Sequence, residues 1–221
     1  MTITLRDGTL SLTIAPERGA EVHALVVAGV EFMYHPPWAS APLPARPVDE
    51  VPWECAWQGG WQLLWPNAGA ACTVDGVEHG FHGAGSVAAF AVTEHDSHRA
   101  SLRCELAGLS CERRFELRDG GVRASARLVN RSERTLPTVL VEHLTLGGPL
   151  AAAGTTLELA GGEIVEQAWD GTPLGAGGAW PWHGDTDYSV LPATGSRFAV
   201  VRDLPAGRAR VAGAHGTTLD L

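Results

Sequence analysis

The sequence predicts a fold made almost entirely of β-strands, and three observations lead to this prediction. Short runs in which apolar and polar residues alternate recur along the chain, as they do in half-buried strands. No window long enough for a helix keeps apolar residues at helical spacing without an intervening glycine or proline. The 27 glycines and 14 prolines separate the runs in the manner of turns.

Eight segments carry the alternating pattern and are predicted to be strands. They are residues Leu10–Ile14, Val22–Val27, Val30–Tyr34, Val87–Thr93, Ala100–Glu105, Cys111–Leu117, Val122–Val129 and Thr138–Thr145. The clearest hairpin has Asp119, Gly120 and Gly121 at its turn, because these residues supply the positive φ angles that a tight turn requires. Strand alternation after this turn predicts one face in the core and one in solvent.

Two stretches interrupt the strand pattern. Residues 36–52 are rich in proline and are predicted to form a long ordered loop over the sheet; a disordered linker is the alternative. The loop is favoured because four tryptophans crowd its end and continue beyond it, namely Trp53, Trp57, Trp61 and Trp65. Residues 171–184 repeat this composition. We expect one domain over residues 1–221.

Composition and charge exclude several classes of function. The formal charge is −9 and the basic residues are scattered, so nucleic-acid binding is not expected. The amino terminus resembles no secretory signal and no stretch approaches a membrane span, which predicts a cytoplasmic protein with no membrane partner. The four cysteines, Cys55, Cys72, Cys104 and Cys111, show no C-x-x-C spacing and are expected to be buried free thiols.

The most informative passage has two parts. Residues 59–69 read GGWQLLWPNAG and residues 76–83 read GVEHGFHG. This run resembles the aldose 1-epimerase, or galactose mutarotase-like, superfamily, whose members carry a G-G-W segment, a P-N-A-G-like turn and an H-G pair. Residues 19–25 with 29–32 are similar to the first hairpin of that family. Residues 112–117, 128–132 and 141–147 are similar to its central strands.

The resemblance implies a fold and a set of site residues. The fold is a β-sandwich of the supersandwich type with a concave sugar site, here shortened at the C-terminus. The catalytic residues are His82, after the H-G pair, and His143, on a central strand. We add Asn67, Trp61 and Asp185 as substrate-binding candidates. For Asp185, the alternative is a solvated loop acid without a role in binding.

The implied chemistry needs no cofactor. Interconverting the anomers of a free aldose requires that a proton leave the C1 hydroxyl and that another reach the ring oxygen. Histidine titrates near neutrality and can donate that second proton or hold the ring oxygen. We expect no metal, because His79 and His82 lie in a loop without helical geometry and no third ligand is evident. For His143, a hydrogen-bonded core histidine is the alternative.

The general base is left open by the sequence. In relatives it is a glutamate on a late strand, whereas no glutamate follows Glu166 in this sequence, and the arginine common after the H-G pair is absent. Glu142 adjoins His143, but neighbours on a strand point to opposite faces.

Two functions follow: an isomerase acting on a monosaccharide, or a carbohydrate-binding protein without catalysis. Because Leu219 and Leu221 continue an alternating pattern, we also expect a homodimer formed through an exposed strand edge.

Overall fold

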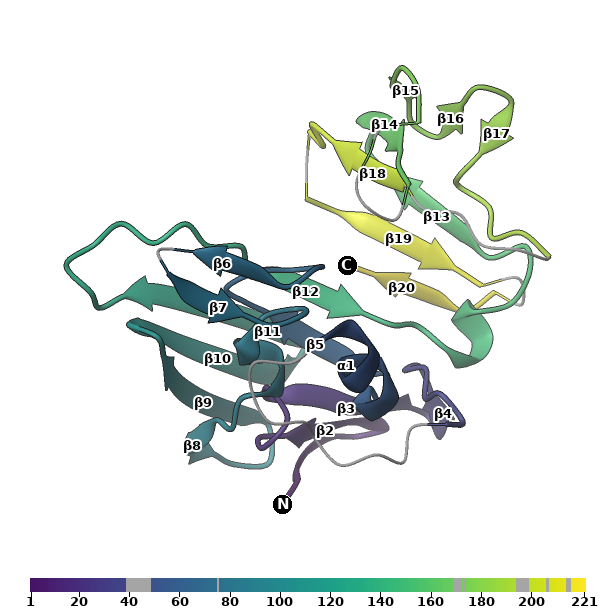
Figure 1. The fold of residues 1–221 in the computed structure, drawn as a ribbon. Coiled ribbons are helices and arrows are strands. Elements are labelled where there is room, and N and C mark those ends of the chain that lie inside the picture. Colours follow the sequence, from purple (N-terminus) through teal and green to yellow (C-terminus); the bar gives the residue numbers. More distant parts are fainter. Residues whose placement is uncertain are drawn as a thin grey trace. The chain divides into compact units, whose positions relative to one another are not determined.

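The structure is a computed structural model, and strands dominate it. It describes residues 1–38, 49–74, 76–168, 172, 174–193, 199–205, 207–213 and 216–221. The chain divides into two compact units, Met1–Leu146 and Gly147–Leu221, each of which is described by itself (Figure 1). The all-β prediction is confirmed. The prediction of a single domain stays a prediction.

The first unit contains a six-stranded antiparallel sheet. Its path runs β1-β2-β3-β5-β12, and β4 pairs with β3. The strands are β1 (Ile3–Asp7), β2 (Leu10–Ala15), β3 (Glu21–Val27), β4 (Val30–Glu31), β5 (Trp61–Leu64) and β12 (Val141–Leu144). Strand β12 therefore lies beside β5, far from it in sequence, and this pairing brings two segments of the predicted site together.

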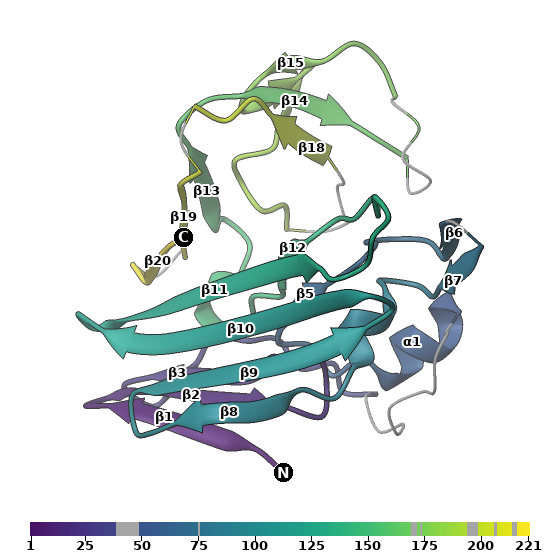
Figure 2. The same cartoon turned by 90° about the vertical axis from the view of Figure 1, so that its left-hand side faces the viewer.

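A second antiparallel sheet of four strands follows the order β11-β10-β9-β8 (Figure 2). The strands are β8 (Ala91–His95), β9 (Arg99–Leu106), β10 (Leu109–Arg118) and β11 (Gly121–Asn130). The hairpin between β10 and β11 confirms the predicted turn, since Asp119 and Gly120 both have positive φ. The strand predicted over 87–93 instead begins at Ala91, because η1 (Ala84–Val87) occupies the earlier residues.

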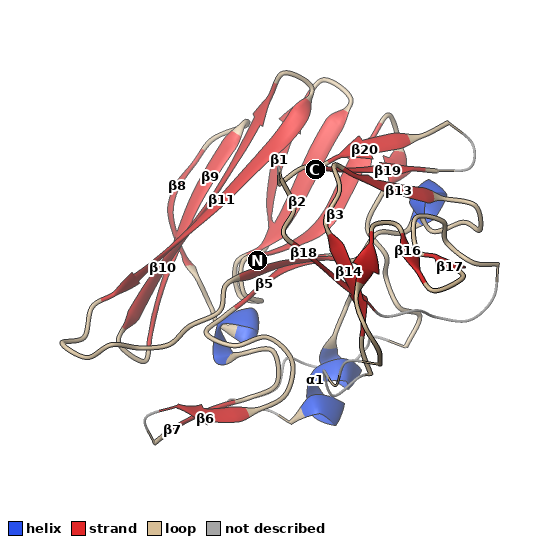
Figure 3. Cartoon of the chain, turned by 90° about the horizontal axis from the view of Figure 1, so that it is seen from above, coloured by secondary structure: helices blue, strands red, loops and turns tan. Residues whose placement is uncertain are grey.

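The two sheets of the first unit pack face to face (Figure 3). Leu12 and Ile14 from one sheet and Leu102 and Phe115 from the other are among the buried residues of the core. Arg113 of β10 also reaches across, donating from Nη1 to the carbonyl oxygen of Ala20 at 2.8 Å. Burial of these apolar side chains stabilises the sandwich.

One short α-helix was not expected from the sequence. Helix α1 (Glu50–Ala56) begins inside the stretch predicted as a loop, of which residues 39–48 lie outside the described residues. Pro52 lies in its first turn, where a missing N–H breaks no intrahelical bond. Tertiary contacts hold this helix: Trp53 is buried, and Arg18 Nη2 donates to the carbonyl of Ala56 at 3.0 Å. Seven residues are too few to form a stable helix alone.

The remaining elements are small sheets. In the first unit, β6 (Cys72–Val74) pairs with β7 (Val77–His79). The second unit begins with η2 (Gly148–Leu150) and contains β13 (Thr156–Leu159), β14 (Glu163–Glu166), β15 (Gly178–Ala179), β16 (Trp182–His183), β17 (Thr186–Asp187), β18 (Ala199–Arg202), β19 (Ala209–Ala212) and β20 (Thr218–Asp220). Their orders are β13-β19-β20, β15-β14-β18 and β16-β17. Among the described residues, no helix is long and apolar enough to cross a membrane.

Candidate functional site

Strand alternation determines which way His143 faces. Its neighbour Glu142 accepts hydrogen bonds at Oε2 from Trp61 Nε1 at 2.6 Å and from Arg113 Nη2 at 2.8 Å. Because Arg113 comes from the other sheet, Glu142 and Trp61 face the interior of the sandwich. His143 is the next residue along β12 and therefore faces away from the second sheet. It pairs across the strands with Gln62 of β5.

His82 lies in the loop between β7 and η1 and is held by two hydrogen bonds to Gly69. Its backbone N–H donates to the carbonyl oxygen of Gly69 at 2.8 Å, and its Nδ1 accepts from the N–H of Gly69 at 2.8 Å. An imidazole nitrogen that accepts carries no proton, so in neutral His82 the proton is on Nε2. His82 has a φ of 58°, a left-handed conformation that is unusual for a residue with a side chain.

The structure brings His82 and His143 together. Their ring centroids are 5.5 Å apart, and Trp53 packs edge-on against His82 at 4.6 Å. Burial, followed by the neighbouring His143, lowers the pKa of His82 from 6.5 to about 4. Burial also lowers the pKa of His143. Both imidazoles are therefore predominantly neutral at pH 7 and present one N–H and one acceptor nitrogen each.

A row of polar side chains crosses the same face of the six-stranded sheet. Val22 pairs with Trp61, which places Glu21 beside Gln62, and Gln62 in turn pairs with His143. The amide of Gln62 donates from Nε2 to Glu21 Oε2 at 3.3 Å. The row Glu21, Gln62 and His143 thus spans β3, β5 and β12 on the face where His82 lies.

Buried polar atoms without a hydrogen-bond partner gather at this face. Five such atoms among the described residues belong to it: Arg18 Nε, Glu21 Oε1, Trp57 Nε1, Gln62 Oε1 and His143 Nδ1. Buried polar atoms are normally satisfied, so a cluster of unsatisfied ones marks a place for a polar ligand or water. A narrow cleft of about 10 Å³, lined by Arg18, Trp57 and Gln62 among others, has room for about one water molecule.

The other three predicted site residues lie in different surroundings. Asn67 is buried and donates from Nδ2 to the carbonyls of Ala70 at 3.1 Å and Gly80 at 3.0 Å, and these bonds fix the loop that carries His82. Trp61 lies on the interior face of β5, 6.2 Å from the ring of Phe115, and so not on the face of His143. Asp185 is exposed in the turn between β16 and β17 of the second unit.

Sequence reasoning missed the polar neighbours of the two histidines. Arg18, Glu21 and Gln62 come from a turn and two different strands, and only the pairing of β3 with β5 makes them adjacent. One signal was present, since Glu21 stands at the start of a strand that is apolar except for His23. The structure leaves the Glu21 side chain only 1 % exposed. A carboxylate so deeply buried is rare without a partner or a function.

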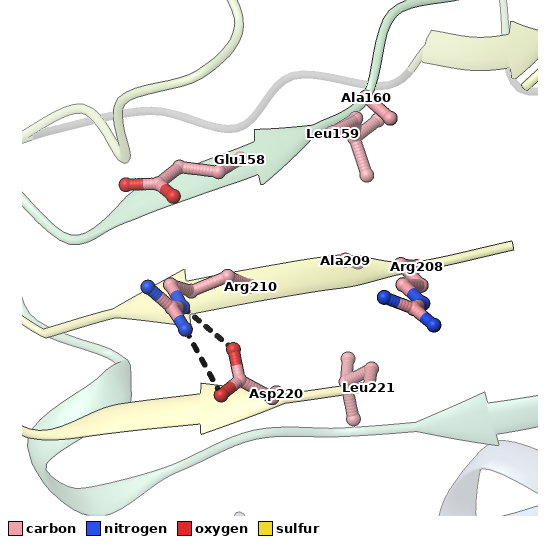
Figure 4. Close-up of a pocket in the computed structure, with 8 residues that line it drawn as sticks. All are labelled: Glu158, Leu159, Ala160, Arg208, Ala209, Arg210, Asp220 and Leu221. Carbon is pink, nitrogen blue, oxygen red and sulfur yellow. Dashed lines mark hydrogen bonds and ion pairs between the residues drawn. The ribbon is translucent and has the colours of Figure 1, made fainter. Parts of the chain in front are cut away.

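A larger cavity lies elsewhere, in the second unit. It has a volume of about 620 Å³ and is lined by β13, β19 and β20 (Figure 4). Its polar feature is the ion pair of Arg210 Nε with Asp220 Oδ1 at 2.6 Å, in which both side chains are mostly exposed. Its lining contains no imidazole and none of the unsatisfied buried atoms. Nor do three His, Cys, Asp or Glu residues come together to hold a metal ion in the described parts of the chain.

Comparison with known proteins places the fold. No protein-family profile and no curated protein matches the sequence. Among solved structures, a galactose mutarotase related enzyme from Lactobacillus acidophilus is similar with a TM-score of 0.67 and 13% identity, over 100% of this chain and 76% of that one. A galactose mutarotase-like protein from Lactobacillus casei is similar with a TM-score of 0.61 and 16% identity, over 100% of this chain and 78% of that one. An aldose epimerase homologue from C. elegans is similar with a TM-score of 0.61 and 14% identity, over 98% of this chain and 76% of that one.

Identities of this size establish the fold alone. The order of the motifs around residues 59–83 and the arrangement of the strands point to the same architecture by separate routes. The chain therefore has a galactose mutarotase-like fold.

Proposed function

We propose that this chain is an aldose 1-epimerase-like isomerase, which binds a free monosaccharide and interconverts its anomers by opening and closing the ring. One observation carries the proposal: the imidazoles of His82 and His143 lie 5.5 Å apart beside a cluster of buried polar atoms that lack partners. A sugar offers several hydroxyl groups that both donate and accept, and so suits such a cluster. The shared fold supports the same assignment.

The two histidines have different roles. His82 has its Nδ1 occupied by Gly69, so its Nε2–H is the group that holds the ring oxygen by a hydrogen bond. His143 has no hydrogen bond at Nδ1 within the described chain, and it serves as the proton donor to that oxygen. Because burial lowers the pKa of His143, its protonated form is a stronger acid than ordinary imidazolium.

The sugar lies beside the cleft rather than inside it, because the cleft holds about one water molecule and neither histidine is among the residues that line it. The half-buried ring of Trp57 supplies a flat surface for the C–H groups of the sugar. Trp53 and Trp57 are stacked, with ring centroids 6.5 Å apart and an interplanar angle of 19°. The Nε1 of Trp57 is one of the unsatisfied atoms and donates to a hydroxyl group in the bound complex. Apolar faces with convergent polar groups are typical of small-ligand sites.

A second function is a carbohydrate-binding protein without catalysis. The small volume of the cleft favours it, since a shallow site holds a sugar less rigidly than ring opening requires.

Polarimetry and fluorescence separate these two functions. Freshly dissolved α-glucose and α-galactose are followed by polarimetry with wild type, His143→Gln and His82→Asn, with exposed His95→Asn as the control. We expect wild type and His95→Asn to accelerate mutarotation, and the two site variants to lose most of this activity. Tryptophan emission titrated with each sugar reports binding. Binding without acceleration supports the second function, and neither binding nor acceleration contradicts both.

A further inference from the structure

We propose that Glu21 is the general base of this site and takes the proton from the anomeric hydroxyl group. The inference rests on the proposed function and names a group that the sequence left unassigned. Glu21 begins β3, and its side chain is only 1 % exposed. It belongs to the cross-strand row that ends at His143, with Gln62 between them.

The contacts of Glu21 leave one carboxylate oxygen unoccupied. Oε2 accepts a hydrogen bond from Gln62 at 3.3 Å, whereas Oε1 has none from the described residues. Two basic groups lie near Oε1, namely Arg18 Nε and His23 Nδ1, each at 3.5 Å. These distances exceed those of charge-assisted hydrogen bonds, which are about 2.7–2.9 Å. The two groups therefore do not occupy the lone pairs of Oε1 with hydrogen bonds.

The spacing fits a pyranose ring. Neighbouring strands lie about 4.8 Å apart, so the backbones at Glu21 and His143 are about 10 Å apart with one strand between them. Two side chains that extend over the same face from these positions can flank a six-membered ring. The anomeric hydroxyl and the ring oxygen are bonded to the same carbon, so a base on one side and an acid on the other reach both.

The other carboxylates on these strands are already engaged. Glu142 faces the sandwich interior, where Trp61 and Arg113 donate to its Oε2. Glu31 accepts two backbone N–H groups at Oε1, from Leu25 at 3.0 Å and from Met33 at 2.8 Å. Glu21 is therefore the carboxylate of the six-stranded sheet, as far as the structure describes it, that combines deep burial with an oxygen on the histidine face that accepts no hydrogen bond.

The proposed step balances in protons and electrons. The Glu21 carboxylate takes the proton of the C1 hydroxyl, and the electron pair of that O–H bond forms the C1=O double bond. The bond from C1 to the ring oxygen breaks, its electron pair stays on the ring oxygen, and this oxygen takes a proton from His143 in its imidazolium form, which is the minor form at pH 7. After rotation about the C1–C2 bond, reclosure reverses each transfer and returns both groups to their starting states.

The test compares two isosteric substitutions on one sheet. Glu21→Gln removes the base, and Glu31→Gln is the matched control because its amide oxygen can still accept the two backbone N–H groups. We expect Glu21→Gln to lower kcat by about 10²–10⁴-fold with little change in sugar binding, and Glu31→Gln to retain activity.

A second variant distinguishes loss of the base from misfolding and from loss of a merely structural contact. Glu21→Ala is assayed with added formate, a small carboxylate that replaces the missing base, and recovery of activity in proportion to formate supports the proposal. Glu21→Gln with the kcat of wild type overturns it and leaves the isomerase function intact. A folded Glu21→Ala that is inactive at every formate concentration also overturns it. A wild type that accelerates no mutarotation overturns both proposals.

Discussion

The lowered pKa of His82 predicts a specific loss of stability in acid. An unfolded chain binds a proton on this histidine below about pH 6.5, whereas the folded chain does not until the pH approaches 4. Between these values the unfolded state binds more protons, so the free energy of unfolding falls as the pH falls. The stabilising contribution of neutral His82 is complete above pH 6.5 and is lost on the way to pH 4.

The magnitude follows from the size of this shift. Each tenfold change in proton affinity is 1.36 kcal/mol, so the change between pH 7 and pH 4.5 is at most about 3 kcal/mol. His82 is partly exposed, and solvent screening reduces this to about 2 kcal/mol. His143 contributes in the same direction, because burial lowers its pKa as well.

His82→Asn isolates this contribution. Asparagine tolerates the φ of 58° better than most residues that have a side chain, and its side-chain oxygen can accept from the N–H of Gly69. Urea unfolding of wild type, His82→Asn and exposed His95→Asn is followed by tryptophan emission at pH 7 and pH 4.5. We expect wild type and His95→Asn to lose about 2 kcal/mol more than His82→Asn over this interval. Equal losses in all three proteins would show that His82 has an ordinary pKa, and the buried neutral imidazole would be refuted.

Two further predictions concern the core. Glu142→Leu leaves the wholly buried guanidinium of Arg113 without its counter-charge, so we expect the free energy of unfolding, measured in urea, to fall by about 2–4 kcal/mol. The control, exposed Arg114→Met, should lower it by less than about 0.5 kcal/mol, and an equally small effect of both substitutions would contradict the pairing. Burial raises the pKa of the Cys111 thiol to about 12, and Cys104 is buried as well. In native protein at pH 8, an aromatic disulfide reagent should therefore label exposed Cys55 and Cys72 quickly, and Cys104 and Cys111 only after unfolding; equal labelling rates for all four thiols would contradict the buried positions.

The sequence by itself determined the local structure of the strands. Alternation identified β2, β9, β10 and β11 to within about two residues, because each strand buries one face and exposes the other. The turn at Asp119 and Gly120 was also predictable, since these residues readily take positive φ. The motif residues His82 and His143 were identified by resemblance, and the structure places their rings together.

Only the tertiary structure decided which polar residues join them. Alternation places Trp61 and Gln62 on opposite faces of the sheet, but it does not say which face is interior. Arg113, which comes from the other sheet, shows that Glu142 faces the interior by donating a hydrogen bond to it, and Trp61 lies on the same face as Glu142. Helix α1 likewise depends on the burial of Trp53 rather than on local propensity. Glu21 becomes a site residue through the pairing of β3 with β5, and such pairing joins residues whose separation in sequence leaves no periodic signal.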